Sequence, residues 1–183
     1  PGCRRMEPAI YGPWEAGLTL IYEDPRLPEP QRFEQRRQVR VEASKGVDGG
    51  WLVRRSYSSL HQPPTELLVF HRGGGTAWVD PQSSQRLPVI PEGFPDRIHH
   101  WEVQGMRCRV LGRAQARLPL SLPAEQRLGV WVEARPPKGA AIRTFYLPGI
   151  GEAETLQQTE RGWVCVNRLV DRGFTHAPPR PER

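Results

Sequence analysis

Residues 17–24 read "GLTLIYED", and the order of the side chains in this stretch decides the fold class. Successive side chains of an extended chain point to opposite faces. Leu18, Leu20 and Tyr22 therefore share one face, and Thr19 and Ile21 lie on the other. This alternation predicts a β-strand with one face in the protein interior.

The same style of sequence recurs along most of the chain. The segments that carry it are "RRQVRVEAS" (36–44), "WLVRRSYSSL" (51–60), "TELLVFHR" (65–72), "VWVEAR" (130–135), "AIRTFYL" (141–147) and "GWVCVNRLV" (162–170). Each is rich in β-branched and aromatic residues and is bounded by Gly, Pro or polar residues. No window of about 11 residues or more shows the 3.6-residue period of an amphipathic helix. The best helical candidate is one turn at 123–127, "PAEQR", so the sequence predicts an all-β or mainly β protein with at most one or two short helices.

Short connections predict that neighbouring strands are antiparallel. They are "VDGG" (47–50), "RGGGT" (72–76) and "PPKGA" (136–140). A two-residue hairpin turn requires positive φ angles, which glycine adopts readily, whereas a parallel crossover needs about a dozen residues or more. The stretch 80–97 has four Pro among its eighteen residues and predicts a long ordered loop.

Length and charge bound the class of protein. A chain of 183 residues is the size of one domain. We expect residues 11–174 to form it, between a flexible N-terminal tail at 1–10 and a Pro/Arg-rich C-terminal tail at 175–183. The formal charge of +6 arises from 24 Arg and two Lys against 20 acidic residues. A basic chain attracts phosphate, but the densest arginine run, at 26–40, is interleaved with Glu and has no nucleic-acid-binding motif, so we predict no nucleic-acid partner.

The stretch "TFYLPGIGEAETL" (144–156) carries two closely spaced glycines. A phosphate-binding loop would need a helix directly after its glycines, but the residues that follow predict a strand, a turn and a second strand. We interpret Gly149 as a turn residue and Gly151 as a bulge or a close backbone approach. Glu152 and Glu154 are expected on one exposed face, where replacement by Gln has little effect.

Several motifs of the C-terminal half occur together in a known order. An aromatic pair precedes "PGIGE" (148–152), and upstream lie "LPVIPEG" (87–93), "HHWEVQG" (99–105) and "RLGVWVEA" (127–134). Over roughly residues 85–170 this order resembles bacterial extracytoplasmic lipoproteins of unknown function with a C-terminal aromatic-PGxG motif. That family is similar in shape to periplasmic lipoprotein carriers, which cup lipid in a curved sheet.

The resemblance implies a single strongly curved antiparallel sheet, that is, a half-open barrel. It also implies an extracytoplasmic location, either periplasmic or anchored to the membrane by an N-terminal lipid. We expect a non-enzymatic protein of the cell envelope that binds an apolar ligand, such as a lipid, or a segment of another envelope protein, in the concave face of its sheet. The alternative is a structural or assembly lipoprotein that acts through its outer surface and has no ligand cavity.

Aromatic side chains on the inner face of the sheet are the candidate ligand-binding residues; the same side chains would serve equally as core. They are Trp51, Tyr57, Trp78, Trp101, Trp131 and Tyr146. No spacing in the chain indicates catalytic residues, a cofactor or a metal site. The adjacent pair His99 and His100 is the most suggestive, but neighbours on a strand point to opposite faces and cannot readily share one ion.

The three cysteines lead to two further expectations. Cys3 lies near the start of the sequence and is followed by a short polar stretch, which is typical of the lipidated cysteine of a bacterial lipoprotein. Cys108 and Cys165 both lie within predicted strands. They could form a disulfide if their strands are neighbours, and buried free thiols are the alternative.

Overall fold

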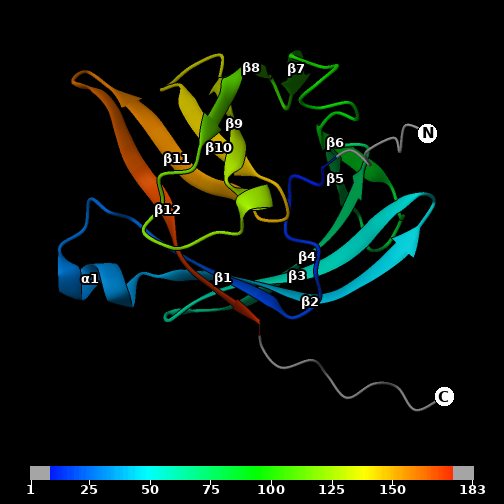
Figure 1. Cartoon of the computed structure of the whole chain (residues 1–183), viewed down its shortest axis with the longest axis horizontal. Helices are drawn as coiled ribbons and strands as arrows, with labels where there is room; N and C mark the ends of the chain where they lie inside the picture. Colours follow the sequence, from blue (N-terminus) through cyan, green and yellow to red (C-terminus); the bar gives the residue numbers. More distant parts are fainter. Residues whose placement is uncertain (1–8, 175–183) are drawn as a thin grey trace.

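The computed structural model describes residues 9–174 and folds them into one sheet of twelve antiparallel strands (Figure 1). The strands are β1 (Leu18–Glu23), β2 (Arg37–Val47), β3 (Gly50–Ser59), β4 (Gln62–Arg72), β5 (Gly75–Val79), β6 (Arg86–Ile90), β7 (His100–Val103), β8 (Met106–Gln115), β9 (Leu128–Arg135), β10 (Ile142–Leu147), β11 (Gly151–Thr159) and β12 (Gly162–Phe174). The helices are α1 (Glu29–Glu34) and the 3-10 turn η1 (Ala124–Gln126). The predicted mainly β, antiparallel fold is confirmed.

The strand order brings the two edges of the sheet together. The order is β6-β5-β4-β3-β2-β1-β12-β11-β10-β9-β8-β7, so two meanders join where β1 pairs with β12. The edge strands β6 and β7 follow one another in the chain, and Trp101 Nε1 on β7 donates a hydrogen bond to the Val89 carbonyl oxygen on β6 at 3.0 Å. The single curved sheet is therefore nearly closed into a barrel.

Two of the predicted hairpins form as expected. Asp48 and Gly49, with φ angles of 49° and 70°, turn the chain between β2 and β3. Gly73 and Gly74, with φ angles of 55° and 81°, do the same between β4 and β5. Positive φ at both central positions matches the right-handed twist of the strands. Residues 136–140 join β9 to β10, as the sequence predicts.

The prediction of one long loop at 80–97 is wrong in its middle. Residues 86–90 form β6, which pairs with β5 from Val79↔Arg86 to Thr76↔Ile90. Pro88 lacks an amide hydrogen and argues against a central strand, but an edge strand tolerates it because one side needs no partner. A six-residue helix such as α1 is too short to show a helical period in the sequence.

The core consists of two clusters of buried side chains. The larger includes Leu20, Val53 and Leu147, and the smaller includes Phe94 and Val130. Cys108 on β8 and Cys165 on β12 are free thiols on strands that are not neighbours, so the disulfide alternative is wrong.

Residues 9–14, which we call the N-terminal strap, cross the interior between the two halves of the sheet (Figure 1). Gly149 N donates to the Ile10 carbonyl oxygen at 2.7 Å, and Arg55 Nε donates to the Pro13 carbonyl oxygen at 3.1 Å. Tyr11 packs edge-on against Phe94, with 5.1 Å between ring centroids. The strap is thus tied to β3 on one side and to the β10–β11 turn on the other.

Most of the two predicted tails, residues 1–8 and 175–183, lies outside the described residues, and so does Cys3. Within residues 9–174, neither helix has the length and apolar character needed to cross a membrane.

Candidate functional site

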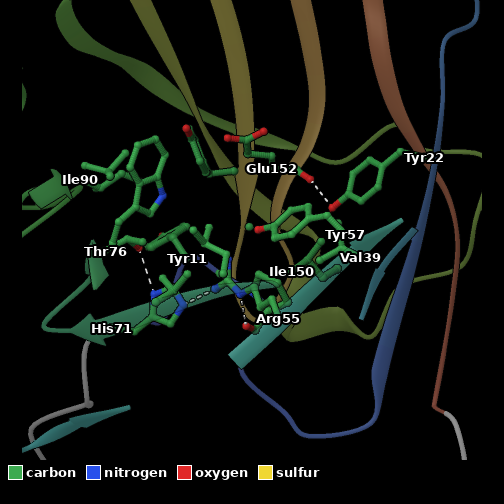
Figure 2. A pocket seen from close by; sticks show the side chains of 18 of the residues that line it. Tyr11, Tyr22, Val39, Arg55, Tyr57, His71, Thr76, Ile90, Ile150 and Glu152 are labelled. Carbon is green, nitrogen blue, oxygen red and sulfur yellow. Dashed lines mark hydrogen bonds between the residues drawn. The ribbon is translucent and has the colours of Figure 1, made fainter. Parts of the chain in front are cut away.

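A half-open cavity of about 350 Å³ lies inside the barrel, beside the N-terminal strap (Figure 2). Its walls come from the strap, from β1 to β6 and from β10 to β12. The lining residues are Tyr11, Gly12, Pro13, Tyr22, Arg37, Val39, Arg55, Tyr57, Leu67, Val69, His71, Thr76, Trp78, Val89, Ile90, Tyr146, Ile150, Gly151, Glu152 and Asn167. Most are apolar or aromatic, with a few polar groups among them.

Strand alternation places the polar groups of one wall. On β3 the inward phase carries Val53, Arg55 and Tyr57, and on β4 it carries Val69 and His71. The inward positions of one strand lie opposite those of the other, as in the pair Val53↔Val69. An arginine and a histidine thus occupy positions that the two-residue period assigns to the interior.

His71 is held in one tautomer by its two neighbours. Arg55 Nη2 donates to His71 Nε2, and because arginine has no acceptor, this ring nitrogen must accept. The proton is then on His71 Nδ1, which donates to Thr76 Oγ1 at 3.0 Å. Burial, together with the charge of Arg55, lowers the pKa of His71 to about 3, so the ring is neutral at physiological pH.

Arg55 is a buried cation that forms no ion pair within residues 9–174. Only 7% of its surface is exposed, and among residues 9–174 no carboxylate lies within ion-pair distance of it. Burial lowers the pKa of Arg55, although the nearby Tyr57 and Glu152 act in the opposite direction. A buried charge that lacks an opposite charge is costly, which makes this side chain the most unusual group of the cavity.

Glu152 faces the same space from β11 (Figure 2). Its backbone carbonyl oxygen accepts a hydrogen bond from the Tyr22 hydroxyl at 2.8 Å. Burial raises the pKa of the Glu152 carboxyl, and the charges of Arg55 and Arg37 and a hydrogen bond with Tyr146 offset this only in part. Glu152 lines the cavity, and much of its surface is exposed to solvent.

The expectation that Glu152 and Glu154 share a plain outer face is therefore wrong. The register between β10 and β11 shifts from Phe145↔Glu154 to Tyr146↔Glu152, which leaves Ala153 as an extra residue. Such a bulge breaks the two-residue period. Glu152 turns into the cavity, whereas Glu154 pairs with Arg168 at 3.5 Å.

The six aromatic candidates divide into two groups of three. Tyr57, Trp78 and Tyr146 line the cavity. Trp51 packs against Trp14, and Trp101 packs against the smaller core cluster. Trp131 stacks on Phe145 and lines a separate, more open hollow with Leu111 and Leu156. Their predicted role in ligand binding stays a prediction.

A carboxylate on the outer face of β8, β9 and β10 forms a different cluster. Glu133 has no exposed surface because three arginines cover it. Arg109 and Arg143 approach it at 3.0 Å and Arg135 at 2.7 Å. Burial by itself would raise the pKa of Glu133, but the hydrogen bonds from Arg135 and Arg143 and the charge of Arg109 outweigh it and hold the pKa below its usual value.

The histidines of the described chain do not gather. In the part of the chain that the structure describes, no three side chains of His, Cys, Asp or Glu lie close enough to hold one metal ion. His71 uses both ring nitrogens within the protein.

Comparison with solved structures supports the fold. No protein-family model matches the chain, and no curated protein sequence matches it. Among solved structures, it is similar to a candidate exported protein with a YmcC-like fold from Bacteroides fragilis, with a TM-score of 0.56 and 10% identity over 90% of this chain and 99% of that one. It is also similar to a candidate lipoprotein from Parabacteroides distasonis, with a TM-score of 0.50 and 10% identity over 92% and 100% of the two chains.

This degree of identity shows a shared fold and nothing finer. The chain has the curved antiparallel sheet of these exported proteins and lipoproteins. The sequence resemblance to extracytoplasmic lipoproteins therefore holds at the level of the fold, and the aromatic-PGxG motif stays a prediction.

Sequence reasoning missed Arg55, His71 and the strap. The sequence did carry a signal for the first two. Arg55 follows Val53 by two residues and His71 follows Val69 by two, so each places a polar side chain on the strand face where an apolar one is expected. No local signal marks the strap, since its contacts lie far away in the sequence.

Proposed function

We propose that this chain is a non-enzymatic binding protein of the bacterial cell envelope that holds an apolar ligand inside its barrel. The observation that carries the proposal is the cavity of about 350 Å³, which stays open although two hydrophobic clusters pack around it. Small-molecule sites occupy roughly 300–1,000 Å³ and combine apolar walls with a few placed polar groups. The cavity wall, with Val39, Leu67 and Ile90 beside Arg55 and Glu152, has this composition.

The alternative is a structural or assembly protein that acts through its outer surface and a free sheet edge. A filled interior would favour it, and the cavity favours binding instead. A free edge would allow a partner strand to pair with the sheet. Here the two edges approach each other, and the hydrogen bond from Trp101 to Val89 bridges them.

The polar groups of the cavity support binding rather than catalysis. Histidine is the most common general base of enzymes. In His71 the nitrogen that would accept a proton already accepts a hydrogen bond from Arg55, and the pKa is lowered to about 3. The ring has no free lone pair for a substrate.

An extracytoplasmic location is part of the proposal. Its support is the fold shared with a candidate exported protein and a candidate lipoprotein. If Cys3 carries the lipid anchor, the full-length protein partitions with membranes and Cys3→Ser releases it into the aqueous fraction. Equal partitioning of both proteins, or a full-length gene without an export signal, would contradict the anchor.

Displacement of a neutral apolar probe tests the binding function. We expect the fluorescence of N-phenyl-1-naphthylamine to rise when it binds the protein and to show a single saturable site. Leu67→Trp enlarges a side chain of the cavity wall and should weaken probe binding at least tenfold. Leu68→Trp is the matched control, because Leu68 is its neighbour on β4, is similarly half-buried and points to the other face.

The two variants should melt at similar temperatures, so that a loss of binding is not a loss of fold. Equal probe affinity of the wild type and Leu67→Trp would show that the probe does not enter the cavity. That result would refute the proposed function.

A further inference from the structure

An apolar surface leads out of the cavity across three adjacent strands. Leu67 on β4 and Trp78 on β5 line the cavity, and Trp78 lies directly opposite Leu87 of β6. Directly opposite residues of antiparallel strands share one face, so Leu87 continues the inner face beyond the cavity. Trp78 is 39% exposed and Leu87 is 48% exposed. We call these three side chains the apolar lip.

A second surface of the cavity is polar and buried, with Arg55 7% exposed and His71 1% exposed. Arg55 uses Nε for the strap carbonyl of Pro13 and Nη2 for His71, which fixes the position of its guanidinium at the wall. The Tyr57 hydroxyl lies beside it, and both residues line the cavity. Arginine stays protonated in proteins. A buried guanidinium with no carboxylate partner in residues 9–174 therefore favours an anion brought by a ligand.

The two surfaces adjoin, because Arg55 on β3 lies directly opposite Leu67 on β4, and Trp78 and Leu87 follow on the next two strands. Together they suit a molecule with two unlike ends. Building on the proposed function, we propose that the ligand is a single-chain carboxylate, such as a fatty acid, which enters head first. Its carboxylate lies against Arg55 and Tyr57, and its chain leaves the cavity across Leu67, Trp78 and Leu87.

Glu152 faces the same space and would repel a carboxylate if both were ionised. Burial raises the pKa of Glu152, so it takes up a proton more readily than an ordinary glutamate. A protonated Glu152 donates a hydrogen bond to an anionic head group instead of repelling it. Tyr146, which interacts with Glu152, adds a further hydroxyl to the head-group end.

Head-group preference is measured on the unmodified protein, so that no variant needs to fold. Dodecanoate, dodecanol and dodecylamine compete for N-phenyl-1-naphthylamine and share one chain length. We expect dodecanoate to bind at least tenfold more tightly than dodecanol, and dodecylamine to bind most weakly. Equal affinities, or the tightest binding by dodecylamine, would overturn the assignment of the head group.

The direction of entry is measured by tryptophan quenching. Bromine quenches indole fluorescence at short range, and the chain carries six Trp. The signal of Trp78 is therefore taken as the difference between the wild type and Trp78→Phe. Dodecanoate brominated at its terminal carbon should quench Trp78 more than dodecanoate brominated next to the carboxylate. The reverse order would place the head group at the lip and overturn the orientation.

The lip is tested by a charge placed on its outermost residue. Leu87→Glu should weaken dodecanoate at least fivefold and leave hexanoate unchanged, because Leu87 lies three strands away from Arg55 and a six-carbon chain is too short to reach it. Leu128→Glu is the matched control, because Leu128 is a leucine of similar exposure (40%) that does not line the cavity. Equal effects of the two variants on dodecanoate would overturn the lip.

The outcomes separate the inference from the function on which it rests. If the probe itself does not bind, the proposed function fails together with this inference. If the probe binds in the cavity but the head groups are not distinguished, the binding function stands and the carboxylate is refuted.

Discussion

The contact between the N-terminal strap and the β10–β11 turn offers a sharp test of how the cavity is built. Gly151 begins β11 with a φ of +86°, and its backbone lies against the strap. A Cβ atom at this position would lie 3.1 Å from Gly12 Cα and 3.1 Å from Pro13 Cδ. Alanine at position 151 would therefore have to adopt a backbone conformation that is unfavourable for a residue with a Cβ atom. Its Cβ atom would also push the strap away from the strand.

The expected loss of stability has two parts. A left-handed conformation costs a residue with a Cβ atom about 1–2 kcal/mol. Crowding of close-packed atoms that cannot rotate away costs a further amount of about 1–3 kcal/mol. Together they predict that Gly151→Ala lowers the free energy of unfolding by about 2–5 kcal/mol.

Two other glycines separate these parts. Gly162 has a φ of +110° and nothing within 4 Å of its Cβ position, so Gly162→Ala should cost only the backbone part. Gly46 has open space as well and no positive φ, so Gly46→Ala should change stability by under about 1 kcal/mol. Urea unfolding at 25 °C, followed by circular dichroism, measures all three. If Gly151→Ala loses no more than Gly162→Ala, the close approach of the strap is refuted.

Three further changes probe other parts of the structure. Glu152→Gln should be at least as stable as the wild type at pH 7, because a protein whose carboxyl has a raised pKa in the folded state becomes less stable as the pH rises toward that pKa. The difference in stability should vanish below the usual glutamate pKa. A variant that is less stable than the wild type at pH 7 would contradict this. Glu133→Gln should lower the free energy of unfolding by about 2 kcal/mol at pH 7. The loss should become smaller in acid, because the stabilisation by a carboxylate with a lowered pKa disappears as the pH falls through that pKa. Equal stability of variant and wild type in urea unfolding would argue against the arginine cluster. Trp101→Phe removes the hydrogen bond that bridges β6 and β7, so we expect a loss of about 1 kcal/mol and faster amide hydrogen exchange in those two strands, and unchanged exchange would show that the seam does not depend on it.

The parts of the fold that sequence predicts are those that local physics determines. The alternation of Leu18, Leu20 and Tyr22 is a property of five consecutive residues, and all three are buried. The turn at Asp48 and Gly49 likewise depends on two neighbouring residues. The sequence did not predict β6, because Pro88 is compatible only with an edge strand and the sequence does not show where the edge of the sheet lies.

The candidate site was harder to predict because it depends on distant contacts and on interruptions of the period. Trp131 resembles a cavity residue in sequence, but its neighbours Val130 and Val132 are the ones buried in the smaller core cluster, so Trp131 faces the other way. The bulge that turns Glu152 inward has no local signal. Arg55 did have a local signal, since a charged side chain on the inward face of a strand indicates a functional site or an unusual core.

The most direct test of the central claim is a crystal structure of the protein saturated with N-phenyl-1-naphthylamine. The account predicts density for the aromatic rings of the probe inside the barrel, between Tyr57, Trp78 and Tyr146. Density instead in the outer hollow beside Trp131 and Leu156, with the interior cavity closed by side chains, would contradict it.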